Sequence, residues 1–128
     1  KEVRDEHKDS DGDPAVKAKI RQIRMERGRA RMMSRVPDAT VVIANPTHFA
    51  VALSYEEGMN APVCIAKGVD AVALKIREVA ENAKVPVVEN APLARALYAT
   101  VDIDDQVPED QYKAVAEVIG FVMRLKGR

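Results

Sequence analysis

Four consecutive residues, Asn45-Pro46-Thr47-His48, hold the groups of this chain that are best suited to chemistry. An asparagine usually reacts when the backbone nitrogen of the next residue attacks its side-chain carbonyl and deamidates it. Pro46 carries no N–H, so this route is closed. The route that remains is attack by the Asn45 side-chain nitrogen on its own backbone carbonyl carbon. That attack closes a succinimide, expels the Pro46 amine and cuts the chain between Asn45 and Pro46.

An amide nitrogen is a weak nucleophile, so the cut needs help from its surroundings. The turn must hold the nitrogen in line with the carbonyl carbon. A donor must stabilise the oxyanion, and a group must move the proton. Thr47, through its backbone N–H or its hydroxyl, and the His48 imidazole are both candidates, and spacing alone does not choose between them. The competing interpretation is an ordinary β-turn, which Asn followed by Pro favours on local statistics.

Strand and helix patterns surround this corner. Residues 40–44 are an unbroken β-favouring run, as expected of a strand buried on both faces. Further strands are predicted over 49–55, over 63–66 with Gly68 as the stop, and over 86–88. Helices are predicted over 69–83, from a cap at Asn90 to Tyr98, and from Pro108 onward. The inner stripe of the last helix is predicted to be Tyr112, Val115, Ala116, Ile119 and Val122. The predicted fold class is α/β: a single small domain with a central mixed sheet of four to five strands flanked by helices.

The charge pattern adds a basic N-terminal helical arm. The formal net charge is zero, yet between residues 14 and 35 Glu26 is the lone acid among many Lys and Arg. Asp13 is a good N-cap, and Pro14 suits the first helical position, where its missing N–H costs nothing. We therefore predict a polar linker over 1–13, a basic helical arm over 14–37 and, over 38–128, an α/β domain that holds the candidate self-cleavage site.

Several functional classes are excluded or disfavoured by the composition. Cys64 is the single cysteine and has no CxxC partner, and there are two histidines, so neither a disulfide scaffold nor a metal site is expected. There is no GxGxxG pattern and no P-loop, and no cofactor is expected. No stretch is long and apolar enough to span a bilayer, and no signal-peptide pattern opens the chain. Because the sequence begins with Lys1, we expect a piece of a longer protein.

Three ordered blocks of sequence carry a resemblance to a known family. They are VVIANPTHFAVAL at 41–53, AKG at 66–68 followed by ALKIR at 73–77, and APLARALY at 91–98. Together they closely resemble the FlhB/YscU family, the membrane-anchored switch proteins of type III secretion export gates. The AVAL that follows the turn and the AKG stretch are more similar to the flagellar branch than to the injectisome branch.

The resemblance implies a function that composition does not. The chain would be the cytoplasmic domain, at the cytoplasmic face of the bacterial inner membrane, of a protein whose missing N-terminal part forms transmembrane helices. Asn45-Pro46 would be a self-cleavage site, cut once, with both fragments staying associated and no catalysis on other substrates. In the family this cut permits the switch of export from rod and hook proteins to filament proteins. The implied partners are these rod, hook and filament subunits, the hook-length ruler protein and other export-gate components.

Two further hypotheses concern a docking surface and an alternative function. Pro92, Leu93, Arg95 and Tyr98 are candidate residues for docking a partner, although apolar side chains of this segment, above all Leu97, could simply pack inward. The alternative function is a non-cleaving α/β adaptor whose basic arm binds a membrane surface or nucleic acid. Specific nucleic-acid recognition is not expected, because the arm lacks interleaved aromatic residues.

Overall fold

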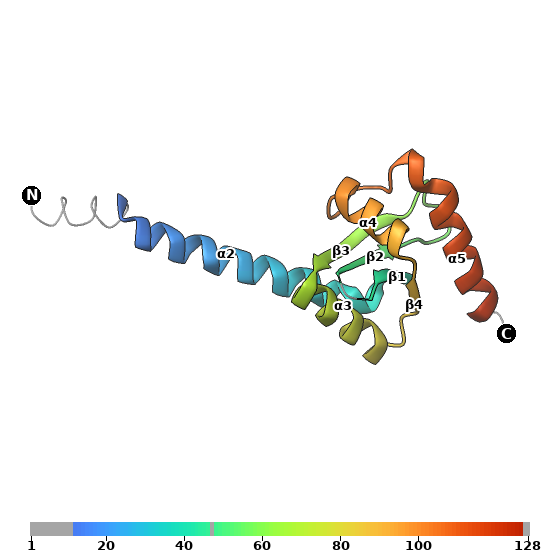
Figure 1. Cartoon of the computed structure of the whole chain (residues 1–128), viewed down its shortest axis with the longest axis horizontal. Coiled ribbons are helices and arrows are strands. Elements are labelled where there is room, and N and C mark those ends of the chain that lie inside the picture. The colour runs from blue at the N-terminus through green and yellow to red at the C-terminus, as the bar shows by residue number, and fades with distance from the viewer. Residues whose placement is uncertain (1–11, 47, 127–128) are drawn as a thin grey trace, which may run out of the picture. The chain divides into compact units, whose positions relative to one another are not determined.

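The computed structural model describes residues 12–46 and 48–126. The chain divides into two compact units, of which the first ends at Arg31 and the second covers Met32–Arg128 (Figure 1). The predicted linker lies outside the described residues except for Gly12 and Asp13. No helix of the described part is long and apolar enough to cross a membrane.

Helix α2 spans Pro14–Arg35, within the range 14–37 predicted for the basic arm. Its start is fixed by Asp13, whose side-chain Oδ1 accepts a hydrogen bond of 2.8 Å from the Ala15 backbone N–H. This contact satisfies one of the free N–H groups of the first turn, which is the role of an N-cap. The last turn of α2 belongs to the second unit, where Met32 is buried in the core.

The second unit is built on a four-stranded mixed sheet. Its strands are β1 (Val41–Asn45), β2 (Phe49–Ser54), β3 (Val63–Val69) and β4 (Val87–Glu89), in the spatial order β3-β2-β1-β4. Strand β2 pairs antiparallel with β1 and β3, and β4 pairs parallel with β1. The central strand β1 is buried along its whole length, because its Val and Ile side chains pack on both faces of the sheet.

Helices cover both faces of this sheet (Figure 1). They are α3 (Asp70–Asn82), α4 (Ala91–Thr100) and α5 (Tyr112–Lys126), with short 3₁₀ helices η1 (Val36–Asp38) and η2 (Glu109–Gln111). Alternate residues of β1 enter different core clusters: Val42 packs with the apolar face of α3, and Val41 and Ile43 pack with α4 and α5. The predicted α/β fold class is confirmed, with four strands.

The prediction is wrong about the end of β3 and about the buried face of the last helix. Strand β3 does not stop before Gly68 but continues to Val69, because Gly68 pairs with Ala50 of β2 and so still belongs to the sheet. The stripe predicted for the last helix is only partly buried: Tyr112 and Ala116 are exposed. The buried positions of α5 are Val115, Val118, Ile119 and Val122. Helix α5 therefore turns a slightly different face to the core than the sequence pattern indicates.

Candidate functional site

The four residues singled out by their chemistry form the connection between β1 and β2. Asn45 is the last residue of β1 and is paired with Phe49, the first residue of β2. Asn45 is buried, with 8% of its surface exposed, and it is the one buried polar residue among those described. The carbonyl of Ala44 accepts a 2.9 Å hydrogen bond from the backbone N–H of Asn90. Asn45 thus sits at the end of a strand that is held on both sides.

A backbone hydrogen bond spans the turn. The N–H of His48 donates to the carbonyl oxygen of Asn45 at 3.2 Å. This oxygen belongs to the carbonyl that the Asn45 side chain would attack, so it would carry the negative charge of a tetrahedral intermediate. A preformed donor on that oxygen is the arrangement of an oxyanion hole. The sequence spacing indicates Thr47 and the His48 imidazole as candidates and gives no sign of this backbone donor.

The His48 side chain lies on the surface beside the start of α3. Its Nδ1 is 3.6 Å from Oδ1 of Asp70, and 63% of the His48 side chain is exposed. The Asp70 backbone N–H donates to the His48 carbonyl oxygen at 2.9 Å. Asp70 has a φ of 48°, in the left-handed region that non-glycine residues adopt uncommonly. The junction of β3 and α3 therefore holds the far end of the turn.

Helix α3 also contacts the middle of the turn. The guanidinium Nη1 of Arg77 donates to the Pro46 carbonyl oxygen at 3.1 Å. Nothing in the sequence around Arg77 points to this contact, because it joins residues 31 positions apart. Thr47, the remaining residue of the predicted site, lies outside the described residues.

The predicted docking residues of α4 lie in different surroundings. Pro92 and Arg95 are exposed, whereas Leu93 has 6% of its surface exposed and belongs to the core beneath α4 and α5. Leu93 is therefore a packing residue, as is the fully buried Leu97. Tyr98 is half-buried, and its ring centroid lies 5.1 Å from that of Phe49. This contact links α4 to the residue that follows His48.

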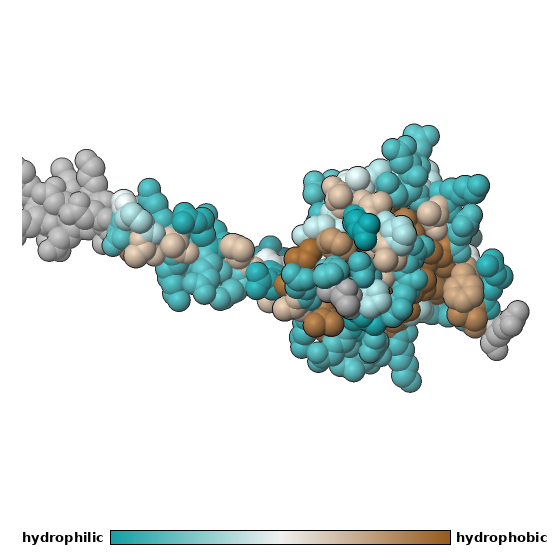
Figure 2. Space-filling model, viewed as in Figure 1, coloured by the Kyte–Doolittle hydropathy of each residue, from teal (hydrophilic) through white to brown (hydrophobic). Residues whose placement is uncertain are grey.

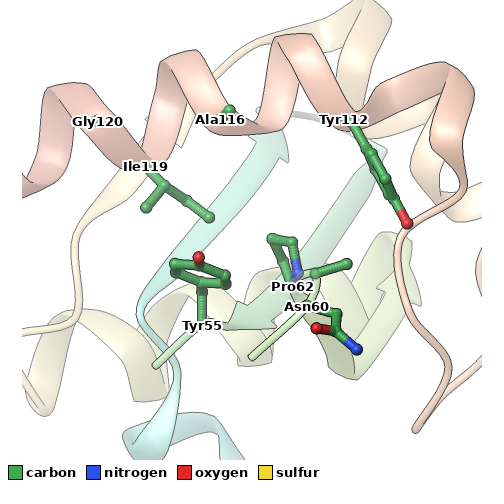
Figure 3. Close-up of a pocket in the computed structure, with 8 residues that line it drawn as sticks. Tyr55, Asn60, Pro62, Tyr112, Ala116, Ile119 and Gly120 are labelled. Carbon is green, nitrogen blue, oxygen red and sulfur yellow. The ribbon is translucent and has the colours of Figure 1, made fainter. Parts of the chain in front are cut away.

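A hollow that no sequence pattern indicates lies beside α5. Its volume is about 330 Å³, and Figure 3 shows Tyr55 and Pro62 facing Ile119 and Tyr112 across it. The remaining lining residues are Asn60, Ala61, Ala116 and Gly120.

Figure 2 shows apolar residues gathered over α5, on which Phe121, Met123 and Leu125 are about half exposed. The α5 residues that the prediction placed in the core, Tyr112 and Ala116, line this hollow instead.

Cys64 has no part in the turn. It is fully buried in β3, and its thiol donates to the Ala66 carbonyl oxygen at 3.5 Å. Burial raises the pKa of this thiol to about 11, which keeps it protonated and unreactive at neutral pH. Among the described residues, no group of His, Cys, Asp and Glu is placed to hold a metal ion.

The fold and the site together define a class of protein: a four-stranded α/β domain with an Asn-Pro turn between its two central strands. Comparison with known families assigns the chain to one family. The family model described as the FlhB HrpN YscU SpaS family matches residues 1–122. The chain belongs to this family.

Particular relatives place the chain near the flagellar members. It is 52% identical over 126 residues to the flagellar biosynthetic protein FlhB of Bacillus subtilis, covering 98% of this chain and 35% of the relative. With FlhB of Salmonella typhimurium it shares 50% identity over 98% of the chain and 33% of that relative. The chain thus spans about a third of the length of these relatives.

Solved structures of related domains have the same fold as this chain. The cytoplasmic domain of FlhB from Shewanella putrefaciens matches with a TM-score of 0.73 and 47% identity, over 77% of this chain and 76% of that one. A mutated EscU C-terminal domain matches with a TM-score of 0.68 and 36% identity, over 71% of this chain and 92% of that one.

Proposed function

We propose that this chain is the cytoplasmic regulatory domain of a flagellar type III protein export gate, and that it cuts itself once between Asn45 and Pro46. The observation that carries the proposal is the hydrogen bond from the His48 N–H to the carbonyl oxygen of a buried Asn45. An ordinary Asn-Pro turn needs neither the burial of the asparagine nor its place at the end of a central strand. Here both support a turn that holds the reacting carbonyl in one orientation.

The reaction needs no outside reagent until its last step. The Asn45 side-chain nitrogen forms a bond to the Asn45 backbone carbonyl carbon and gives up a proton. The His48 N–H stabilises the oxyanion, and the exposed His48 imidazole is placed to exchange protons with solvent. When the oxyanion collapses, the bond to the Pro46 nitrogen breaks and this nitrogen takes a proton. Water then opens the succinimide, which leaves a carboxyl group at the end of the first fragment.

The two fragments, 1–45 and 46–128, stay together in this proposal. Strand β1 belongs to the first fragment, yet it lies between β2 and β4 of the second. Val41, Val42 and Ile43 are fully buried there, and burying one such side chain contributes about 1.5–3 kcal/mol. Cutting therefore changes the turn that joins β1 to β2, while the core stays intact.

Variants of a related protein support the choice of residues. EscU C-terminal domains have been crystallised with a substituted asparagine, with a substituted proline next to it and with a substituted histidine two positions further on. Asn45, Pro46 and His48 have this spacing. We assign these three residues, with Thr47, to the self-cleavage site of this chain.

The cut would permit the export gate to change from rod and hook proteins to filament proteins. These export substrates, the hook-length ruler protein and other gate components are the partners of the proposal, at the cytoplasmic face of the inner membrane. The exposed residues Pro92 and Arg95 of α4, the half-buried Tyr98, and the apolar hollow beside α5 are the surfaces on which docking would be tested first.

Export from cells tests the proposed switch. Cells whose full-length protein carries Asn45→Ala should secrete hook protein and fail to secrete filament protein, while the wild-type protein supports both. Filament secretion equal to that of the wild type, from a variant proven to be uncut, would contradict the proposal. The adaptor with a basic arm would then be the function to test, through the salt dependence of its binding to phosphate-bearing surfaces.

A further inference from the structure

Arg77 of α3 reaches the turn from a distant part of the sequence. We infer that Arg77, oriented by Glu89 of β4, is a positioning residue for the cleavage at Asn45-Pro46. This inference rests on the proposed self-cleavage and names a residue on which its rate depends.

The guanidinium of Arg77 makes two contacts through two different nitrogens. Nη1 donates to the carbonyl oxygen of Pro46 at 3.1 Å, and Nη2 lies 3.6 Å from Oε1 of Glu89. Glu89 is fixed beside the site, since it is the partner of Ala44 in the parallel ladder of β1 and β4. The Arg77 side chain has 22% of its surface exposed, and it reaches Pro46 at the surface of the domain.

The contact with Pro46 restricts the leaving group of the cut. The pyrrolidine ring already fixes φ of Pro46. The orientation of the Pro46 carbonyl sets ψ, and the bond from Arg77 holds that carbonyl in place. The His48 N–H holds the Asn45 carbonyl on the other side of the scissile bond. Hydrogen bonds therefore fix the carbonyls of both residues that share the bond to be cut, which favours a single geometry for the attack.

The two-nitrogen arrangement depends on arginine in particular. Its planar fork can donate in two directions from one rigid group, whereas a lysine offers a single charged point on a flexible chain. If Arg77 served only to join α3 to β4 through Glu89, a lysine would keep most of that role. If it positions Pro46, the lysine variant should cleave slowly despite keeping the charge.

Cell-free synthesis of the full chain starts the reaction at a defined time, and denaturing mass measurement of quenched samples gives the rate. We expect Arg77→Gln to cleave roughly ten-fold or more slowly than the wild type, and Arg77→Lys also to cleave slowly. Glu89→Gln should slow cleavage when Arg77 is present and add nothing to Arg77→Gln. The matched control is Lys75→Gln on the same helix, which removes an exposed cation paired with Glu78 and should leave the rate unchanged.

A readout on the carbonyl itself separates positioning from general stability. In the uncut Asn45→Ala background, the ¹³C shift of the Pro46 carbonyl should move on Arg77→Gln and stay in place on Lys75→Gln. A wild-type chain that cleaves while Arg77→Gln cleaves equally fast overturns the inference and leaves the proposed function standing. Slow cleavage with an unmoved Pro46 carbonyl also overturns it, because the effect would then be structural. A wild-type chain that never cleaves overturns both.

Discussion

The backbone N–H of His48 points at the carbonyl oxygen of Asn45, 3.2 Å away. In a protein that does not react, this is the closing hydrogen bond of a turn. In a chain whose turn begins with a buried asparagine and continues with proline, the same bond becomes a donor placed on the oxygen where charge develops. Substitutions that remove this donor or the proline should therefore change the chemistry of the turn.

Pro46→Ala should redirect the chemistry of Asn45. The new residue supplies a backbone N–H, which reopens attack on the Asn45 side-chain carbonyl. The expected product is a deamidated chain in place of part of the cut chain. Mass measurement separates the two outcomes, since deamidation leaves one slightly heavier chain and cleavage leaves two fragments. Undiminished cleavage with no deamidated chain would show that proline does not decide between the routes.

Substitutions at His48 should separate its side chain from its backbone. His48→Ala keeps the N–H that faces the Asn45 carbonyl and loses only the imidazole, so cleavage should be slower but still measurable. His48→Pro removes the N–H itself, and loss of one oxyanion donor typically costs about 10²–10³ in rate. Time courses of both variants test this order. Folding of His48→Pro is checked by circular dichroism in the Asn45→Ala background. Equal rates for the two variants would argue against the backbone donor.

Gly68→Ala should destabilise the domain next to the site. A Cβ at Gly68 would lie 2.8 Å from Cβ of Val72 and would collide with its Cγ1, because α3 crosses close to β3 there. We expect a loss of about 1–3 kcal/mol in the free energy of unfolding, typical of overpacking. The matched control is Gly28→Ala in α2, where an added Cβ meets nothing within 4 Å. Chemical denaturation measures both, and equal stabilities would contradict the close approach.

The sequence predicts most of the fold and only part of the site. The β-branched run of β1, the Asp13 cap and the Asn90 cap, whose Oδ1 accepts from the Leu93 N–H, are local signals, and each has its predicted place. Periodicity wrongly predicts that Tyr112 is buried. Which face of α5 is buried depends on how the helix packs against its neighbours, and the helix sequence alone does not determine that packing.

The contacts of the turn were beyond local patterns for a different reason. Arg77 lies 31 residues from Pro46, and Asp70 reaches His48 only because β3 pairs with β2 and carries α3 to the edge of the turn. The composition of the turn was therefore visible in the sequence, whereas its supporting groups depend on the tertiary fold.

Cys64 should make stability depend on pH in alkaline solution. Burial raises the pKa of its thiol from 9.0 to about 11, so the unfolded chain loses this proton first as the pH rises. The stabilisation is fully present below about pH 9 and is lost as the pH approaches 11, by on the order of 2–3 kcal/mol. Denaturation curves of Cys64→Ala should lack this part of the loss. Parallel pH profiles for the two proteins would contradict the burial effect.

The claim that the chain cuts itself is tested by the intact mass of the purified protein under denaturing conditions. The wild-type chain should give two masses, for Lys1–Asn45 and Pro46–Arg128, and Asn45→Ala purified in parallel should give one full-length mass. A wild-type chain that keeps a single full-length mass after long incubation at neutral pH would contradict the claim.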